Sequence, residues 1–320
     1  MTDGPLMFLV CGEALYDVFL RDEPGRGPVG LTAVIGGSPL NVAIGLARQG
    51  ERAGFFAGLS EDPLGARLAA HIAAEGVDGR YLCRKPNPTT LSLVSLGSGG
   101  VPHYTFYGHA AADISLTLAD LPVLGPEVTG VHAGSYTLVA QPVADAVAAL
   151  LARERHRLIT LDPNIRPTVE PDMAIWRRRI DALLPHVAVV KASDEDLDRL
   201  HPGEPPERIA LRWLDQGPAV VIITRGPNGA VALTRRLRLD CPAPPVAVVD
   251  TVGAGDTFQA TLIAGLLAAG IRDRAGIAGL GETDLAALLT RCCHAAAITC
   301  GRHGADLPSR DEIDRSQATG

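Results

Sequence analysis

A glycine-rich turn followed directly by an acid is the stretch of this 320-residue sequence best suited to chemistry. It runs Gly253-Ala254-Gly255-Asp256, after an apolar run and before a long helix of small and apolar residues. Glycines let an anion approach the main chain, and the first turn of a helix adds unpaired N–H groups and a dipole. A carboxylate would repel a phosphate held there, unless it takes a proton from the attacking group. A turn that holds a phosphoryl group and a base beside it would be the minimum equipment for phosphoryl transfer. So short a pattern taken alone, however, is better explained by an acid that stabilises the start of a helix.

Apolar runs alternate with helical stretches along most of the chain, which predicts a largely parallel, doubly wound sheet covered by helices. The runs expected as its strands are residues 6–10, 54–59, 130–133, 158–161, 187–190, 219–224 and 230–234. Four polar clusters stand where such runs end. The first contains Glu13 and Asp17; the second, Asp162, Asn164 and Arg166; the third, Lys191, Ser193 and Asp194; and the fourth, Thr224 and Gly226. Because the ligand crevice of an open parallel sheet lies at the carboxyl ends of its strands, we expect these clusters to meet.

Two pairs of extended segments do not fit this main sheet. They are residues 14–20 and 31–35, joined by a Pro/Gly-rich turn at 23–28, and residues 89–96 and 103–107, joined by glycines at 97–100. The second pair is not fully apolar, and its glycine-rich turn is typical of a hairpin. We therefore expect both pairs to lie outside the main core.

Composition excludes several classes of function. The formal net charge is −7 and Lys and Arg form no run, which argues against a nucleic-acid partner. The six cysteines show no CxxC pair, as expected of reduced thiols in a cytoplasmic protein. No basic segment precedes residues 6–10, and the longest apolar helix, near residues 258–269, is too short to span a membrane.

Signatures near both ends of the chain resemble those of the ribokinase-like (PfkB-type) carbohydrate kinases. Residues 248–267 resemble the C-terminal signature, and residues 36–41 (GGSPLN) with the alanine-containing helix that follows resemble the N-terminal one. Three further stretches are similar to the fructokinase branch: residues 12–17 (GEALYD), 104–113 and 162–167 (DPNIRP). The resemblance extends over residues 6–308.

The resemblance implies a ribokinase-like three-layer αβα sandwich with a mostly parallel central sheet and a small β-sheet lid. The implied division is an α/β domain of residues 1–12, 36–87 and 110–310, a discontinuous lid of residues 13–35 and 88–109, and a frayed tail of residues 311–320. Such a protein would be a monomer or a homodimer formed through the lid.

The resemblance also implies a role for individual residues. Asp256 would be the catalytic base, beside the amides of Gly253, Ala254 and Gly255. The sugar would contact Asp17, Gly36, Gly37, Asn41, Phe106, Arg166 and Asp256. ATP would contact Asn164, Lys191, Ser193, Thr224, Gly226, Gly229, Gly253, Gly255 and His294. Asp194 and Asp196 would hold Mg²⁺ through water, and Asp250, Val252, Thr299 and Gly304 would bind a monovalent cation such as K⁺.

The sequence departs from the family pattern at three of these places. Gly108 and His109 stand where the branch often has an arginine after its aromatic pair. Where the family has its strict Asn-x-x-Glu element, this chain offers Ser193 and Asp196, or Asp194 and Glu195. His294 stands where many relatives have an asparagine, and a core histidine explains it equally well.

The implied reaction is transfer of the ATP γ-phosphoryl group to a primary hydroxyl, first of all of D-fructose to give fructose 6-phosphate. The alternatives within the family are 2-keto-3-deoxygluconate or another ketose-like sugar, and then a nucleoside. A different class is a catalytically silent sugar-sensing protein of the same fold, against which the retained Asp256 argues. A dinucleotide-binding dehydrogenase is set aside, because residues 11–17 (CGEALYD) lack the required GxGxxG.

Overall fold

The computed structural model describes residues 6–21, 29–96 and 102–319. The turns predicted at 23–28 and 97–100 lie outside these ranges. Within them, no helix has both the length and the apolar character needed to cross a membrane.

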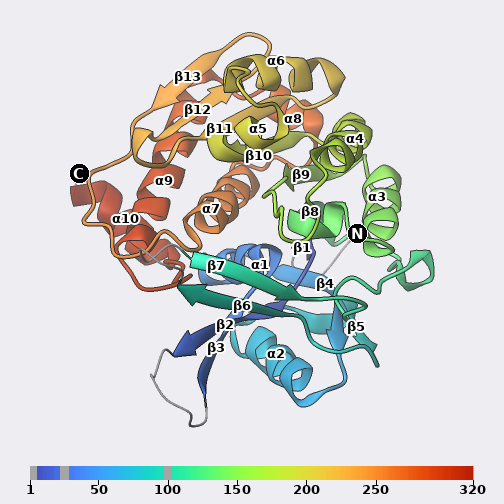
Figure 1. Cartoon of the computed structure of the whole chain (residues 1–320). Coiled ribbons are helices and arrows are strands. Elements are labelled where there is room, and N and C mark those ends of the chain that lie inside the picture. The colour runs from blue at the N-terminus through green and yellow to red at the C-terminus, as the bar shows by residue number, and fades with distance from the viewer. Residues whose placement is uncertain (1–5, 22–28, 97–101, 320) are drawn as a thin grey trace.

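One large sheet forms the centre of the described structure (Figure 1). Its strand order is β13-β12-β11-β10-β9-β8-β1-β4-β5. The bounds are β1 (Met7–Cys11), β4 (Ala53–Ser60), β5 (Leu82–Lys85), β8 (Val128–Gly134), β9 (Leu158–Asp162), β10 (Val189–Ser193), β11 (Val220–Thr224), β12 (Ala230–Leu233) and β13 (Arg238–Cys241). Every pairing from β5 to β11 is parallel, and only β12 and β13 add antiparallel pairings at one edge.

Helices cover both faces of this sheet. Their bounds are α1 (Ser38–Arg48), α2 (Pro63–Ala74), α3 (Val143–Arg153), α4 (Met173–Leu183), α5 (Asp194–Leu200), α6 (Pro206–Gln216), α7 (Ala254–Ala268), α8 (Arg274–Ala278), α9 (Glu282–Cys300) and α10 (Arg310–Thr319). Side chains of a strand point alternately to the two faces. In β1, accordingly, Phe8 and Val10 join the core shared with α1, α7 and α9, whereas Met7 and Leu9 join the core shared with α3, α4 and α6. The predicted αβα sandwich is confirmed.

A small second sheet forms the predicted lid (Figure 1). Its strands are β2 (Leu15–Arg21), β3 (Gly30–Gly36), β6 (Leu91–Leu96) and β7 (Pro102–Tyr107), in the order β3-β2-β6-β7. Tyr16 and Val18 of β2 are buried, while Phe19 and Leu20 at the other end of the strand are exposed, so burial decreases along β2.

The predicted frayed tail is wrong, because residues 310–319 form the helix α10. Ile313 is fully buried. Asp314 pairs with Arg291 of α9 at 2.5 Å, and Glu312 pairs with Arg302 at 2.5 Å. One buried apolar anchor and three ion pairs, the third between Arg310 and Glu51, therefore dock a helix whose other residues are mostly polar.

Candidate active site

The glycine-rich turn has the geometry that an anion site needs. Gly253 is the N-cap of α7 and has φ +80°, in the left-handed region that favours glycine. A Cβ atom at Gly253 would lie 2.7 Å from the Cβ atom of Ala305, so no larger residue fits there. Gly255 is exposed in the first turn of the helix. The first-turn N–H groups of α7 thus lie beside an open surface.

Asp256 is held by the start of a different helix. Ser38 Oγ donates a hydrogen bond to Asp256 Oδ1 at 2.6 Å, and Asn41 Nδ2 donates one to Oδ2 at 2.8 Å. Asp256 is only 8% exposed. Gly37, the N-cap of α1, has φ +116°, and it lets Ser38 and Asn41 face α7. The N-terminal and C-terminal signatures of the sequence therefore meet at one carboxylate.

The lid brings a second carboxylate towards this place. Asp17 of β2 lies opposite β3, and a Cβ atom on Gly36 would be 2.6 Å from Asp17 Oδ2. Burial raises the pKa of Asp17, while a hydrogen bond from Ser92 and the charge of Arg166 lower it. Asp17, Gly36, Gly37 and Asn41 therefore come together in the structure, and the charge of the exposed Arg166 reaches Asp17.

Phe106 lies at the far edge of the lid, on β7. Its ring packs edge-on against Tyr136, with ring centroids 5.3 Å apart. A Cβ atom on Gly108 would be 2.1 Å from the Phe106 ring, so Gly108 leaves room for this packing. A cavity of about 850 Å³ opens beside Phe106, Gly108 and His109 and extends to α4.

A buried ion pair supports the turn from the sheet side. Lys191 Nζ lies 2.6 Å from Asp162 Oδ2, and the two residues are 4% and 1% exposed. The same Nζ donates to the carbonyl oxygen of Gly255 at 3.3 Å. Burial raises the pKa of Asp162 to about 6, against the opposing effect of Lys191. Lys191 was predicted as a site residue; Asp162 was not, because an acid at a strand end is common.

The residues predicted for magnesium lie at the end of β10. Ser193 is the N-cap of α5 and accepts from the Asp196 N–H at 3.0 Å. Asp196 Oδ1 accepts from the Ile165 N–H at 3.2 Å, next to Asn164, whose φ is +43°. Among the described residues, no group of three or more His, Cys, Asp or Glu side chains could hold a metal. These side chains fit an ion held mainly by phosphates and water, as Mg²⁺ often is.

The turn after β11 also requires glycine. Gly226 has φ +50° and Gly229 has φ +80°. A Cβ atom on Gly229 would lie 2.0 Å from the carbonyl oxygen of Cys241, whereas one on Gly226 would meet nothing within 4 Å. Thr224 ends β11 just before this turn, and its Oγ1 donates to the carbonyl oxygen of Ala192 in β10 at 3.5 Å.

The residues predicted for a monovalent cation gather around Asp250. Its Oδ1 accepts from the Val252 N–H at 3.0 Å and its Oδ2 from the Gly304 N–H at 2.9 Å. Thr299 lies 2.7 Å from Thr257 of α7, hydroxyl to hydroxyl. The loop after α9 is therefore fastened to Asp250 through Gly304, and the last turn of α9 is fastened to α7 through Thr299.

His294 is turned towards the C-terminal helix. Its Nδ1 lies 3.4 Å from Ser316 Oγ of α10, and the ring is only partly buried. The described contacts of His294 thus run to α10 rather than to the turn.

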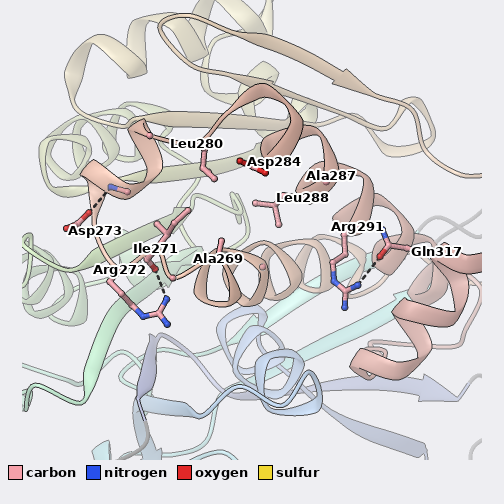
Figure 2. A pocket seen from close by; sticks show the side chains of 14 residues that line it. Ala269, Ile271, Arg272, Asp273, Leu280, Asp284, Ala287, Leu288, Arg291 and Gln317 are labelled. Carbon is pink, nitrogen blue, oxygen red and sulfur yellow. Dashed lines mark hydrogen bonds between the residues drawn. The ribbon is translucent and has the colours of Figure 1, made fainter.

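A second cavity, of about 900 Å³, lies elsewhere. Figure 2 shows it between the end of α7, α8 and α9, with Leu280, Leu288 and Arg291 around it. It lies at the opposite end of α7 from Asp256, and none of the predicted site residues lines it.

An anion-binding turn with a hydrogen-bonded carboxylate beside it, under a β lid at the edge of a parallel sheet, defines the class of ribokinase-like phosphotransferases. Residues 7–312 match the pfkB family carbohydrate kinases, and the chain belongs to that family.

Relatives and solved structures agree with this assignment. A fructokinase of Rhizobium leguminosarum bv. trifolii is 38% identical over 280 residues, covering 87% of this chain and 85% of the relative. The crystal structure of a Xylella fastidiosa fructokinase with bound ATP has a TM-score of 0.87 at 24% identity and covers 98% of both chains. A double mutant of Vibrio cholerae O395 fructokinase, with fructose, ADP and potassium bound, has a TM-score of 0.81 at 24% identity, over 98% of this chain and 99% of that one.

Proposed function

We propose that this carbohydrate kinase transfers the γ-phosphoryl group of ATP to the primary hydroxyl of D-fructose and forms fructose 6-phosphate. The observation that carries the chemistry is Asp256, held by Ser38 and Asn41 beside the first-turn amides of α7. Support for the sugar comes from the relative in Rhizobium leguminosarum, which is a fructokinase.

In the proposed mechanism, Asp256 takes the proton of the sugar hydroxyl as its oxygen attacks the γ-phosphorus of ATP. The bond from that phosphorus to the β–γ bridging oxygen breaks, and ADP leaves. The amides of residues 253–256 stabilise the charge on the transferring group, because they are fixed before the reaction begins. Lys191 adds a positive charge 3.3 Å from the Gly255 carbonyl.

The lid would hold the sugar and exclude water. Asp17 accepts from two hydroxyls, and Gly36, Gly37 and Asn41 contact the same face, since unpaired buried hydroxyls are costly. Phe106 and Arg166 complete the sugar site. Closing the lid limits transfer to water, which would waste ATP.

ATP would lie across the strand ends, on the Gly226–Gly229 turn and beside Asn164, Lys191, Ser193, Thr224 and His294. Mg²⁺, when bound, neutralises charge on the phosphate oxygens, and Asp194 and Asp196 would hold it through water. A monovalent cation, K⁺ by analogy with the Vibrio cholerae structure, would lie at Asp250, Val252, Thr299 and Gly304.

The second candidate substrate is 2-keto-3-deoxygluconate or another ketose-like sugar. A carboxylate sugar calls for a cation near the lid, and Arg166 would supply one, because its charge reaches Asp17. Fructose is ranked first because the relatives of this chain include fructokinases. A nucleoside comes third. A silent sugar sensor is disfavoured because Asp256 is held ready for proton transfer.

We further propose a cytoplasmic monomer, or a homodimer formed through the lid. All six cysteines are free thiols, which suits a reducing compartment. Large apolar side chains are exposed on both faces of the lid, namely Leu20, Leu31 and Tyr107 on one face, and Phe19 and Val34 on the face that carries Asp17. Light scattering of the purified chain distinguishes the two states, and substitution of Leu31 and Val34 by serine should abolish a lid dimer.

The experiment that tests the proposed substrate is a screen of ATP-dependent phosphoryl transfer over fructose, 2-keto-3-deoxygluconate, other sugars and nucleosides. We expect fructose to give the highest kcat/KM. A higher value for any other compound would overturn the choice of sugar, and no turnover with any of them would favour the sensor.

A further inference from the structure

Glu13 is a buried carboxyl group that the mechanism above does not use. It follows β1 and is 1% exposed. Its Oε2 has no hydrogen-bond partner among the described residues. Its main chain is part of the site, because a Cβ atom on Gly37 would lie 2.6 Å from the Glu13 carbonyl oxygen. Whatever fixes Glu13 therefore also fixes the turn that presents Ser38 and Asn41 to Asp256.

Several charged and titratable groups surround the Glu13 carboxyl. Ser135, which follows β8, makes a side-chain hydrogen bond to it, and the charges of Asp113 and Arg166 reach it. Tyr136 interacts with both Glu13 and Asp113. Because β8 is the neighbour of β1 in the sheet, this cluster fills the space between two adjacent strand ends.

Asp113 is the better-satisfied of the two acids. Thr90 Oγ1 donates to Asp113 Oδ1 at 2.5 Å, and the Tyr136 hydroxyl donates to Oδ2. Thr90 immediately precedes β6 and Asp113 follows β7, so both lie where the lid joins the main domain. Asp113 therefore fastens the root of the lid to the end of β8.

Two neighbouring buried carboxyls do not both ionise readily, since like charges in a desolvated site repel each other. Burial raises the pKa of Asp113 too, but two side-chain donors, Thr90 and Tyr136, lower it, whereas Glu13 has one such donor, Ser135. Glu13 is left with the proton: burial raises its pKa to about 8, and Asp113 raises it while Ser135 and Arg166 lower it.

We propose that Glu13 is a positioning residue that works as a neutral acid, joined with Asp113 to hold the lid root, the Gly37 turn and Arg166 in the arrangement that binds the sugar. Loss of its proton places a second negative charge beside Asp113 and draws Arg166 towards Glu13, away from the sugar and Asp17. The sugar site then weakens while the phosphate side is unchanged. This inference rests on the proposed function.

The test compares Glu13→Gln and Glu13→Ala with the wild type in kcat/KM for the sugar and in KM for ATP, from pH 6 to 9.5. Glutamine has the shape of the neutral acid and cannot ionise. We expect the wild-type kcat/KM for the sugar to fall as pH rises through about 8. Glu13→Gln should keep the neutral-pH value within about threefold and lose that fall, and Glu13→Ala should lose about tenfold or more at every pH, as expected when a buried polar group is left unpaired. The proposal would be overturned if kcat/KM for the sugar fell at alkaline pH in Glu13→Gln as it does in the wild type. It would also be overturned if Glu13→Gln lost as much kcat/KM as Glu13→Ala.

Thermal unfolding gives a second readout that needs no substrate. The pKa of Glu13 is raised from 4.5 to about 8, so the folded state binds the extra proton between these values and loses stability as pH rises across them. Glu13→Gln has no such loss, and its Tm relative to the wild type should therefore increase from pH 6 to pH 9. A gap that stays constant over this range would overturn the neutral-acid assignment. A growing gap in a protein inactive on fructose would instead show that only the substrate had been misassigned.

Discussion

The proposed phosphate side and the proposed sugar side of this site differ in how their charged side chains are held. On the phosphate side, Asp256 of α7 accepts two hydrogen bonds from α1, and Lys191 of β10 is paired with Asp162 of β9 through Oδ2, while Asp162 Oδ1 has no hydrogen-bond partner among the described residues. On the sugar side, Arg166 is exposed and the buried Glu13 retains an unpartnered oxygen. In the proposed mechanism, the fold alone organises the phosphate side, whereas the lid and the sugar complete the sugar side. Variants on the two sides should therefore fail in different kinetic constants.

The largest effect is expected from Asp256→Asn, which removes the base but keeps the shape. The kcat should fall by about 10²–10⁴-fold, the range for loss of a general base. The KM for ATP and for the sugar should change little. Steady-state kinetics measure this, and Asp273→Asn, which alters only the exposed N-cap of α8, is the matched acid-to-amide control. A kcat close to that of the wild type would contradict the assignment of the base.

Lys191→Met tests whether the phosphate side is held by its buried ion pair. Removing one partner leaves Asp162 buried and uncompensated, and should cost about 3–5 kcal/mol of unfolding free energy. Urea denaturation measures it. The double variant Lys191→Met with Asp162→Asn should recover most of that stability but not the affinity for ATP. Equal stability of the single variant and the wild type would show that this pair does not organise the turn.

Asp17→Asn should affect the sugar side alone. Hydrogen bonds to a charged group contribute about 1.5–3 kcal/mol, so the KM for the sugar should rise by about 10–100-fold. The KM for ATP serves as the internal control. Gly36→Ala should act in the same direction, since its Cβ atom would crowd Asp17 Oδ2 at 2.6 Å. An equal rise in both KM values would erase the distinction between the two sides.

Ser38→Ala should have the smallest effect. Asp256 keeps its hydrogen bond from Asn41, and one lost hydrogen bond of about 1 kcal/mol corresponds to a decrease in kcat of less than tenfold. The same kinetic assay measures it. A decrease as large as that in Asp256→Asn would mean that Ser38 itself takes part in proton transfer.

The phosphate side could be predicted from sequence because its information is contiguous. Within residues 253–256, glycine geometry, a helix start and an acid stand next to one another. The sheet could be predicted for a similar reason, since its buried strands are short apolar runs between polar turns.

Other elements could not be predicted, or were missed, for identifiable reasons. Glu13 and Asp162 are single acids after strands, and only the folded structure shows that they are buried and what faces them. The helix α10 depends on one buried side chain, Ile313, and on ion pairs with distant residues. The helix α6, by contrast, could be predicted from the sequence, because the spacing of its buried Ile209, Trp213 and Leu214 is a helical signal.

We propose that this protein transfers the γ-phosphoryl group of ATP to the primary hydroxyl of fructose. The most direct measurement incubates the protein with ATP, Mg²⁺, K⁺ and fructose, and couples the product to phosphoglucose isomerase and glucose-6-phosphate dehydrogenase, which together report fructose 6-phosphate as NADPH. We expect NADPH to form in step with ADP, and to fall with Asp256→Asn. Release of ADP without NADPH would contradict the claim.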